Sequence, residues 1–106
     1  MRLDMRELDL GARYKVVNST ITPRPIAWIT TVSAEGVVNA APYSFFNACG
    51  VEPPLVMLGL LKDMRTGAYK DTATNIAASG EFVVNLVSEA DAEAMNMSSV
   101  DAPRDV

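Results

Sequence analysis

The stretch TPRPIAWITTVSAEGVVNAAP, residues 22–42, contains the signals that decide the expected fold. The two prolines around Arg24 disfavour helix and favour extended backbone. Residues 26–32, IAWITTV, are rich in β-branched and aromatic side chains, SAEG at 33–36 is turn-forming, and VVNAA is again extended in character. We therefore expect a β-hairpin whose second strand stops or bends at Pro42, at an edge or a bulge of the sheet.

Two apolar segments farther along the chain predict more strands. Residues 55–61, LVMLGLL, contain no charged or hydrogen-bonding side chain, which is typical of a central strand buried on both faces. Residues 81–87, EFVVNLV, predict a strand in which Phe82, Val84 and Leu86 share one face. Together with the hairpin, these strands indicate an antiparallel barrel or sheet with attached helices and disfavour a doubly wound fold.

A short helix is expected between these two apolar segments. It begins at about Thr72, has Ala73, Ile76 and Ala77 on one face, and stops at Gly80, since glycine is the common residue after a helix C-terminus. The helix therefore links the central strand to the strand at 81–87.

The two ends of the chain give weaker signals. In SEADAEAM, Ser88 and Asp91 have the spacing of a capping box, so we expect a helix that ends near Ser98. Residues 1–18 mix charges with leucines in no clean period, and we expect an arm or a short irregular element there. Four or so strands leave exposed edges, so either the chain dimerises or it is an incomplete barrel.

Composition restricts the possible functions. The 106 residues suffice for one small domain, and 13 acidic against 9 basic side chains give a net charge of −4, which argues against nucleic acid or an anionic membrane as a partner. No apolar run approaches the roughly 20 residues that cross a bilayer. The lone Cys49 and the lack of a charged-then-apolar leader favour a reducing, cytoplasmic location. The absence of histidine disfavours metal sites and histidine-based catalysis, so we expect no metal.

Three polar residues, Lys70, Asp71 and Thr72, stand at the expected start of the first helix. Asp71 is a good N-cap, because its carboxylate can accept hydrogen bonds from the free N–H groups of the first turn. Lys70 and Thr72 flank the same turn, where the helix dipole favours an anion such as phosphate. Taken singly, Asp71 would be a plain cap and Lys70 a solvated charge.

The ordered motifs TPRPIAWITT, NAAPYSFFN, PPLVMLGL and KDTATNIAASGEFVVNL resemble the flavin reductase-like family, the flavoprotein oxygenase branch of the FMN-binding split barrels. The resemblance covers about residues 18–86. It implies a mainly β fold with short helices, an FMN-binding split β-barrel of which this chain is an incomplete N-terminal portion. Residues 1–106 are then a single flavin reductase-like FMN-binding domain that lacks its C-terminal part.

The resemblance also implies an FMN at a homodimer interface, with the flavin ring against the first hairpin and the phosphate near the helix start. Carried over position by position, the expected cofactor-binding residues are Arg24, Thr30, Thr31, Asn39, Ser44, Phe45, Lys70, Asp71 and Thr72. No catalytic side chain is implied, because the flavin itself carries the redox chemistry.

The implied activity is an FMN-dependent NAD(P)H oxidoreductase of the flavin reductase type, which transfers hydride between nicotinamide and flavin. The alternatives are a flavoredoxin-type FMN electron carrier without nicotinamide turnover, and a β-rich interaction module without cofactor. Three residues also have a purely structural interpretation: Arg24 as a simple loop arginine, Trp28 as a core residue, and Cys49 as a small buried residue.

Overall fold

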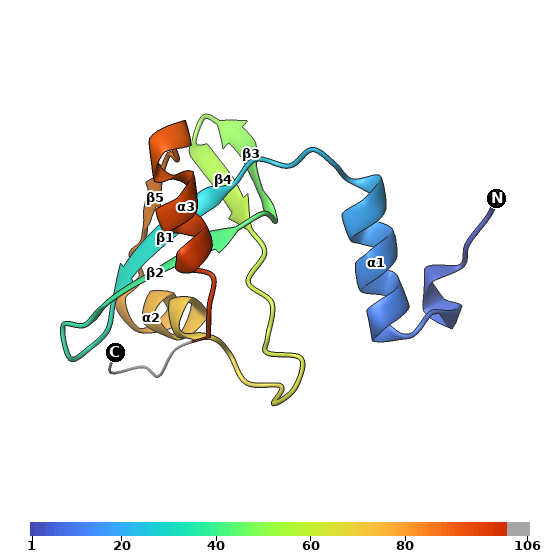
Figure 1. Cartoon of the computed structure of the whole chain (residues 1–106), viewed down its shortest axis with the longest axis horizontal. Helices are drawn as coiled ribbons and strands as arrows, with labels where there is room; N and C mark the ends of the chain where they lie inside the picture. The colour runs from blue at the N-terminus through green and yellow to red at the C-terminus, as the bar shows by residue number, and fades with distance from the viewer. Residues whose placement is uncertain (102–106) are drawn as a thin grey trace.

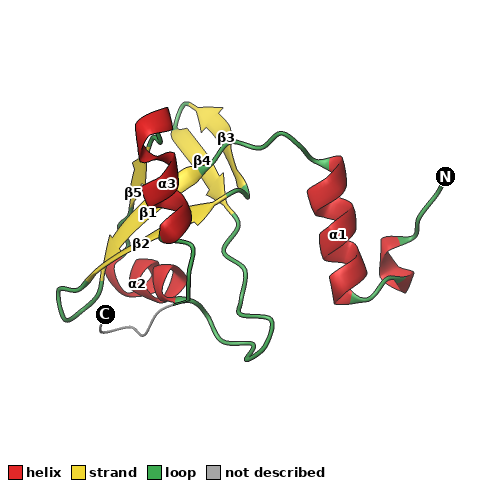
Figure 2. Cartoon of the chain, in the orientation of Figure 1, coloured by secondary structure: helices red, strands yellow, loops and turns green. Residues whose placement is uncertain are grey.

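Two antiparallel sheets form the body of the computed structural model, which describes residues 1–101 of the chain (Figure 1, Figure 2). The three-stranded sheet has the order β2-β1-β5 and the two-stranded sheet the order β3-β4. Their bounds are β1 Ala27–Val32, β2 Val38–Tyr43, β5 Val83–Asn85, β3 Phe46–Val51 and β4 Pro54–Leu58.

The predicted hairpin is confirmed as β1 and β2. The two strands pair in register from Val32 opposite Val38 to Ala27 opposite Tyr43, around a turn at residues 33–37. Pro42 lies within β2, which ends one residue later, and β2 is an edge strand. An edge tolerates proline because one side of the strand has no partner that needs its N–H.

Helix α2 (Asp71–Ser79) packs on this three-stranded sheet and encloses the core. Ala27 and Ile29 are fully buried on the face of β1 toward which Thr31 also points, as the two-residue period of a strand requires. The helix ends at Gly80, whose φ of 71° is the left-handed conformation of a C-cap. The predicted stop is therefore confirmed.

The buried face of α2 is centred on polar residues and only partly coincides with the predicted apolar face. Thr72 and Asn75 are buried, at 1% and 2% exposure, whereas Ala73 and Ile76 are half-buried and Ala77 is exposed. The reason is specific hydrogen bonding. Asn75 Nδ2 donates to Thr31 Oγ1 at 3.0 Å across the contact, so the polar side of the helix faces the sheet.

The prediction of a central strand at 55–61, buried on both faces, is wrong. Strand β4 covers Pro54–Leu58 and pairs with β3 alone, and Leu55 and Met57 are about half exposed. Nothing among residues 1–101 covers both faces of this hairpin. Cys49 was expected to be buried, but it is exposed where the register shifts between Ala48 and Gly50.

Residues 1–18 contain more regular structure than predicted. A 3₁₀ turn, η1 (Met5–Glu7), precedes helix α1 (Leu10–Thr20), whose N-cap Asp9 accepts from the N–H of Ala12 at 2.7 Å. None of the residues of α1 is buried, and its apolar residues do not gather on one face, so the sequence shows no amphipathic pattern there. Figure 1 shows α1 standing apart from the sheets.

The last elements are the 3₁₀ turn η2 (Glu89–Asp91) and helix α3 (Ala92–Met97), which ends at the C-cap Ser98 as predicted. The Ser88 hydroxyl donates to the Asp91 carboxylate at 2.6 Å instead of bonding the backbone, so the predicted capping box is not formed. Trp28 is half-buried, and its Nε1 donates to Ser98 Oγ at 2.9 Å, which ties α3 to the sheet. The described helices are all too short or too polar to cross a bilayer.

Candidate functional site

A polar cavity of about 290 Å³ lies where α2 begins. One wall is β2, a second is the first turn of α2, and a third is the segment that follows α3. Four of the nine expected site residues line it, namely Asn39, Lys70, Asp71 and Thr72. The structure thus brings the strand motif and the KDT motif to one place, although they are some thirty residues apart in sequence.

The first turn of α2 is fixed against β2 by a side-chain hydrogen bond. Asn39 Nδ2 donates to Thr72 Oγ1 at 2.9 Å, and Thr72 is nearly inaccessible to solvent. Both groups are part-buried or buried, where an unpaired polar atom would be costly. The bond therefore holds the N-terminus of α2 at a defined position beside the strand.

Lys70 occupies the N-cap position of α2, and Asp71 is the first residue inside the helix. The prediction that Asp71 is the N-cap is therefore wrong by one position, and the helix has no side-chain cap hydrogen bond from Lys70. The ammonium of Lys70 lies 3.4 Å from the carboxylate of Asp101, with both side chains partly exposed. A cation beside the N–H groups of a helix start forms an environment that suits an anion.

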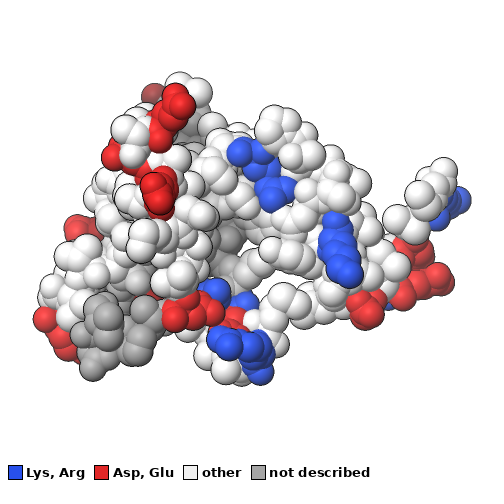
Figure 3. All heavy atoms as spheres, viewed as in Figure 1, with Lys and Arg blue, Asp and Glu red and all other residues white. Residues whose placement is uncertain are grey.

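The ion pairs at the rim of this cavity extend to the loop before α2. Arg65 lies 3.4 Å from Asp101 and 3.2 Å from Asp63. The side-chain hydrogen bond from Arg65 lowers the pKa of the Asp63 carboxyl below its usual 3.8, and the backbone N–H of Arg65 adds to this effect. Figure 3 shows acidic and basic side chains gathered together at this lower edge of the molecule.

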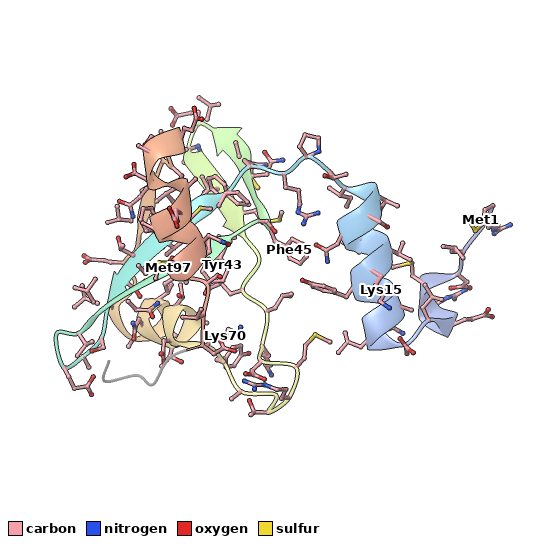
Figure 4. The ribbon with its side chains drawn as sticks, in the orientation of Figure 1. Met1, Lys15, Tyr43, Phe45, Lys70 and Met97 are labelled. Carbon is pink, nitrogen blue, oxygen red and sulfur yellow. The ribbon has the colours of Figure 1, made fainter. Side chains whose placement is uncertain are left out.

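A second cavity, of about 180 Å³, adjoins the first and is mostly aromatic and apolar. We call it the aromatic slot. Its lining consists of Tyr14, Pro42, Tyr43, Ser44, Phe45, Gly59, Leu61 and Lys70. Pro42, Tyr43 and Lys70 line both cavities, so the slot and the polar cavity meet at Lys70. Figure 4 shows Phe45 in the space between the sheets and α1.

The floor of the slot requires a glycine. The N–H of Gly59 donates to the carbonyl of Phe45 at 2.7 Å, and a Cβ on Gly59 would come within 2.7 Å of the Cβ of Phe45. That separation is closer than nonbonded carbons approach, so a larger residue would displace the Phe45 ring. Sequence reasoning missed Gly59, although a glycine in an otherwise apolar strand is a signal of close backbone approach.

Arg24 joins the end of α1 to the slot. Its guanidinium donates to Asn18 Oδ1 at 2.7 Å and to Ser44 Oγ at 3.3 Å, and it lies 5.3 Å from the centre of the Phe45 ring. It also donates to the carbonyl of Ile21. Arg24 Nε is buried with no hydrogen-bond partner among the described residues. Arg24, Ser44 and Phe45, three of the expected site residues, are thus brought together.

The two threonines of β1 lie elsewhere. Thr30 Oγ1 accepts from Asn85 Nδ2 at 3.2 Å, and Thr31 Oγ1 accepts from Asn75. Both line a separate hollow at the C-terminal end of α2 and neither lines the two cavities that meet at Lys70. The site as predicted therefore divides into a cluster of seven residues and this pair.

Comparison with known families identifies the chain. A sequence profile described as "Flavin reductase like domain" matches residues 19–106. Since this is most of the chain, the protein belongs to that family. The resemblance inferred from the ordered motifs is confirmed.

Solved structures of similar proteins have the same fold. Nitrilotriacetate monooxygenase component B from Bacillus cereus is 36% identical with a TM-score of 0.89, over 98% of this chain and 50% of that one. The 2-nitrobenzoate 2-nitroreductase NbaA from Pseudomonas fluorescens is 37% identical with a TM-score of 0.81, over 96% and 48%. A split-barrel protein from Shewanella frigidimarina, 21% identical, has a TM-score of 0.73 over 100% and 52%. The predicted fold class, a partial split β-barrel, is confirmed.

Curated relatives occur in distant bacteria. A protein of Deinococcus radiodurans is 46% identical over an alignment of 105 positions that covers 95% of this chain and 46% of the relative. A protein of Halalkalibacterium halodurans is 44% identical over 103 residues, 97% and 49%. Both are uncharacterised. The chain spans about half the length of the curated relatives it matches.

Proposed function

We propose that this chain is an FMN-binding flavoprotein that transfers hydride between NAD(P)H and flavin, as a cytoplasmic flavin reductase. The observation that carries the proposal is the junction at Lys70, where a polar cavity at a helix start meets an aromatic slot. FMN has two parts that match these cavities: a phosphate for the polar cavity and a flat ring for the aromatic slot. Residues 1–106 are proposed to be one FMN-binding domain, the N-terminal portion of the split barrel.

The residues present fit the cofactor. The helix start and Lys70 suit a phosphate, and Asn39 and Thr72 fix that helix start in place. On the slot side, the Arg24 guanidinium lies over the Phe45 ring and donates to Ser44 Oγ, so a cation adjoins two residues that line the slot. When bound, FMN supplies an electron-accepting ring that takes up hydride, so no histidine or carboxylate pair is needed.

Two groups of residues in the chain are proposed to bind the two ends of FMN. Lys70, Asp71 and Thr72, with Asn39, are assigned to the phosphate end. Arg24, Ser44 and Phe45 are assigned to the ring, where hydrogen-bond donors stabilise negative charge on a reduced flavin. Thr30 and Thr31 do not line the same cavities, and their contribution is proposed to be indirect, through the hydrogen bonds that join β1 to Asn75 of α2 and to Asn85 of β5. The slot is mostly aromatic and apolar, which suits contact with a flat ring.

A homodimer is part of the proposal because the chain exposes much surface, with many large apolar side chains among the exposed residues. Its total accessible surface, polar and apolar together, is 8107 Å². A compact monomer of this mass would expose roughly 5,800 Å². The excess is larger than the roughly 800 Å² that each partner buries in an ordinary specific interface. The β3–β4 hairpin, with Leu55, Val56 and Met57 about half exposed, is the proposed contact.

Two of the similar proteins support an oxidoreductase. One is named as a component of nitrilotriacetate monooxygenase and the other as a 2-nitrobenzoate 2-nitroreductase. Both names denote redox chemistry. A reductase acting on flavin is consistent with membership of the family and with the fit of the two cavities.

The test uses the purified chain, FMN and reduced nicotinamide nucleotides. We expect the chain to bind FMN stoichiometrically, with the bound flavin visible in its absorption spectrum, and to oxidise NADH or NADPH in the presence of flavin. Bound FMN without nicotinamide oxidation would instead indicate a flavoredoxin-type electron carrier. A chain that binds no flavin at millimolar FMN would contradict the proposal and favour an interaction module.

A further inference from the structure

Helix α1 stands apart from the sheets, yet one of its residues reaches the candidate site. None of the residues of α1 is buried, and Tyr14 is 45% exposed. Tyr14 nevertheless lines the aromatic slot together with Phe45 and Lys70. A side chain from an outlying helix thus forms one wall of a cavity whose other walls belong to the sheets.

The helix turn that carries Tyr14 is held beside the slot by a chain of hydrogen bonds. Arg24 donates to Asn18 Oδ1 at 2.7 Å, and Asn18 Nδ2 donates to the carbonyl of Tyr14 at 2.9 Å. Arg24 also donates to Ser44 and lies over Phe45, both of which line the slot. The turn of α1 that carries Tyr14 is therefore tied to the slot through Asn18.

The composition of the slot indicates its ligand class. Tyr14, Tyr43 and Phe45 contribute three aromatic rings, and Lys70 supplies a cation where the polar cavity begins. Aromatic rings favour stacked or edge contacts with another flat ring. A ligand that extends from the slot toward Lys70 would have a flat ring at one end and an anion at the other.

We infer that Tyr14 contacts the flavin ring and forms a wall of the ring site, with Asn18 as the residue that positions it. The inference rests on the proposed function, since it assigns the ring of FMN to the slot. None of the nine residues expected from the sequence lies in α1, so this helix is an addition to the site.

The experiment compares FMN with riboflavin, which has the same ring and no phosphate. Tyr14→Leu removes the aromatic ring but keeps apolar bulk and a good helix former at an exposed position, so the chain should fold. Tyr14→Phe keeps the ring. Lys15→Ala is the matched control, because Lys15 is the next residue of α1 and does not line the slot.

Binding is measured by titration of the full chain and by quenching of flavin fluorescence, without any turnover. Tyr14→Leu should weaken FMN and riboflavin by the same factor, about 2- to 10-fold, and reduce the quenching. Tyr14→Phe and Lys15→Ala should bind as the unmodified chain does. Asn18→Ala, in which Tyr14 is present but less well held, should weaken both flavins by a smaller factor.

The outcomes separate the two proposals. If the unmodified chain binds FMN and Tyr14→Leu binds both flavins with unchanged affinity and quenching, the inference is overturned while the proposed function stands. If Tyr14→Leu weakens FMN but leaves riboflavin unchanged, Tyr14 acts on the phosphate end and the inference is also overturned. If the unmodified chain binds neither flavin, the proposed function is overturned, and this inference with it.

Discussion

Strand β1 reads AWITTV and is buried at alternate positions, whereas strand β4 reads PLVML and is exposed over four of its five residues. The more apolar strand is the less buried one. The difference lies in what each sheet packs against, because α2 covers one face of β1 and β4 pairs with β3 alone. An apolar strand sequence therefore indicates that the strand needs a packing partner. It does not show which element packs on it, because that depends on the fold.

The contact between α2 and the three-stranded sheet is polar. Asn75 bonds Thr31 and Asn39 bonds Thr72, so two side-chain hydrogen bonds join α2 to the sheet. Buried polar pairs of this kind fix position more than they add stability, since folding forms them at the expense of hydrogen bonds to water. In this protein they set the start of α2, where the candidate phosphate site lies.

The largest expected effect tests the difference in burial directly. Ile29→Ala should lower the free energy of unfolding by about 3 kcal/mol, because Ile29 is fully buried and its loss leaves a cavity. Leu55→Ala, at a position 52% exposed in the single chain, should cost less than about 1 kcal/mol as long as the chain is monomeric. Both are measured by urea denaturation at a protein concentration low enough to prevent dimerisation. A loss at Leu55 as large as that at Ile29 in the monomer would break the comparison.

The β1–β2 hairpin and the end of α2 could be predicted because their signals are local. Chain breakers bracket β1, and Gly80 supplies the left-handed conformation that ends the helix. Burial of 55–61 could not be predicted, because it depends on which element packs there. Helix α1 was missed because its residues, from Leu10 to Thr20, form no apolar face.

The candidate site was predictable where residues share a motif. The structure brings Asn39 of one motif to Thr72 of another, as the resemblance implies. Tyr14, Gly59 and Asn75 were not anticipated, because their roles arise from contacts with distant segments. The error of one position at the N-terminus of α2 has a local cause, since the residue at which a helix begins is defined only to within one or two positions.

The next prediction asks which region binds the ligand. Lys70→Ala should weaken FMN binding by about 10- to 100-fold through loss of a charge-assisted contact at the start of α2. Lys62→Ala is the matched control, because Lys62 follows the exposed hairpin and lies 4.6 Å from the ring of Tyr69, outside both cavities. Affinity is measured by fluorescence titration. Equal losses in the two variants would point to general electrostatics rather than a site at α2.

A smaller effect is expected for the polar contact under α2. Asn75→Ala should cost roughly 1–2 kcal/mol of unfolding free energy, because the 2% exposed amide leaves Thr31 Oγ1 without its donor. Asn47→Ala in β3 is the control, since the Asn47 side chain is exposed and accepts only from the neighbouring Ala48 N–H among the hydrogen bonds described. Denaturation of both variants, with Thr31→Val to complete a double-mutant cycle, measures the coupling. Additive losses from Asn75→Ala and Thr31→Val would contradict it.

The smallest effect concerns the loop that connects the exposed hairpin to α2. The Asp63 carboxylate accepts from the backbone N–H groups of Arg65 and Thr66, and the Arg65 side chain lowers its pKa below 3.8. Because the pKa is lower in the folded chain, the stabilisation is present at neutral pH. It is lost as the pH falls below 3.8 and through the lowered pKa. The loop should therefore keep its geometry over the whole neutral range and loosen only in acid.

The measurement is an NMR titration of the Asp63 carboxyl in the unmodified chain and in Arg65→Ala. The midpoint should lie below 3.8 in the first and rise toward 3.8 in the second, since the guanidinium that favours the charged form is gone. Asp63→Asn keeps the side-chain oxygen that accepts from the backbone but removes the charge, so it should retain the turn and lose the pH dependence. Identical midpoints with and without Arg65 would mean that the ion pair does not hold the loop between the β3–β4 hairpin and α2. The loop would then be held by backbone hydrogen bonds, such as the one that Gly67 N–H donates to the carbonyl of Asp63.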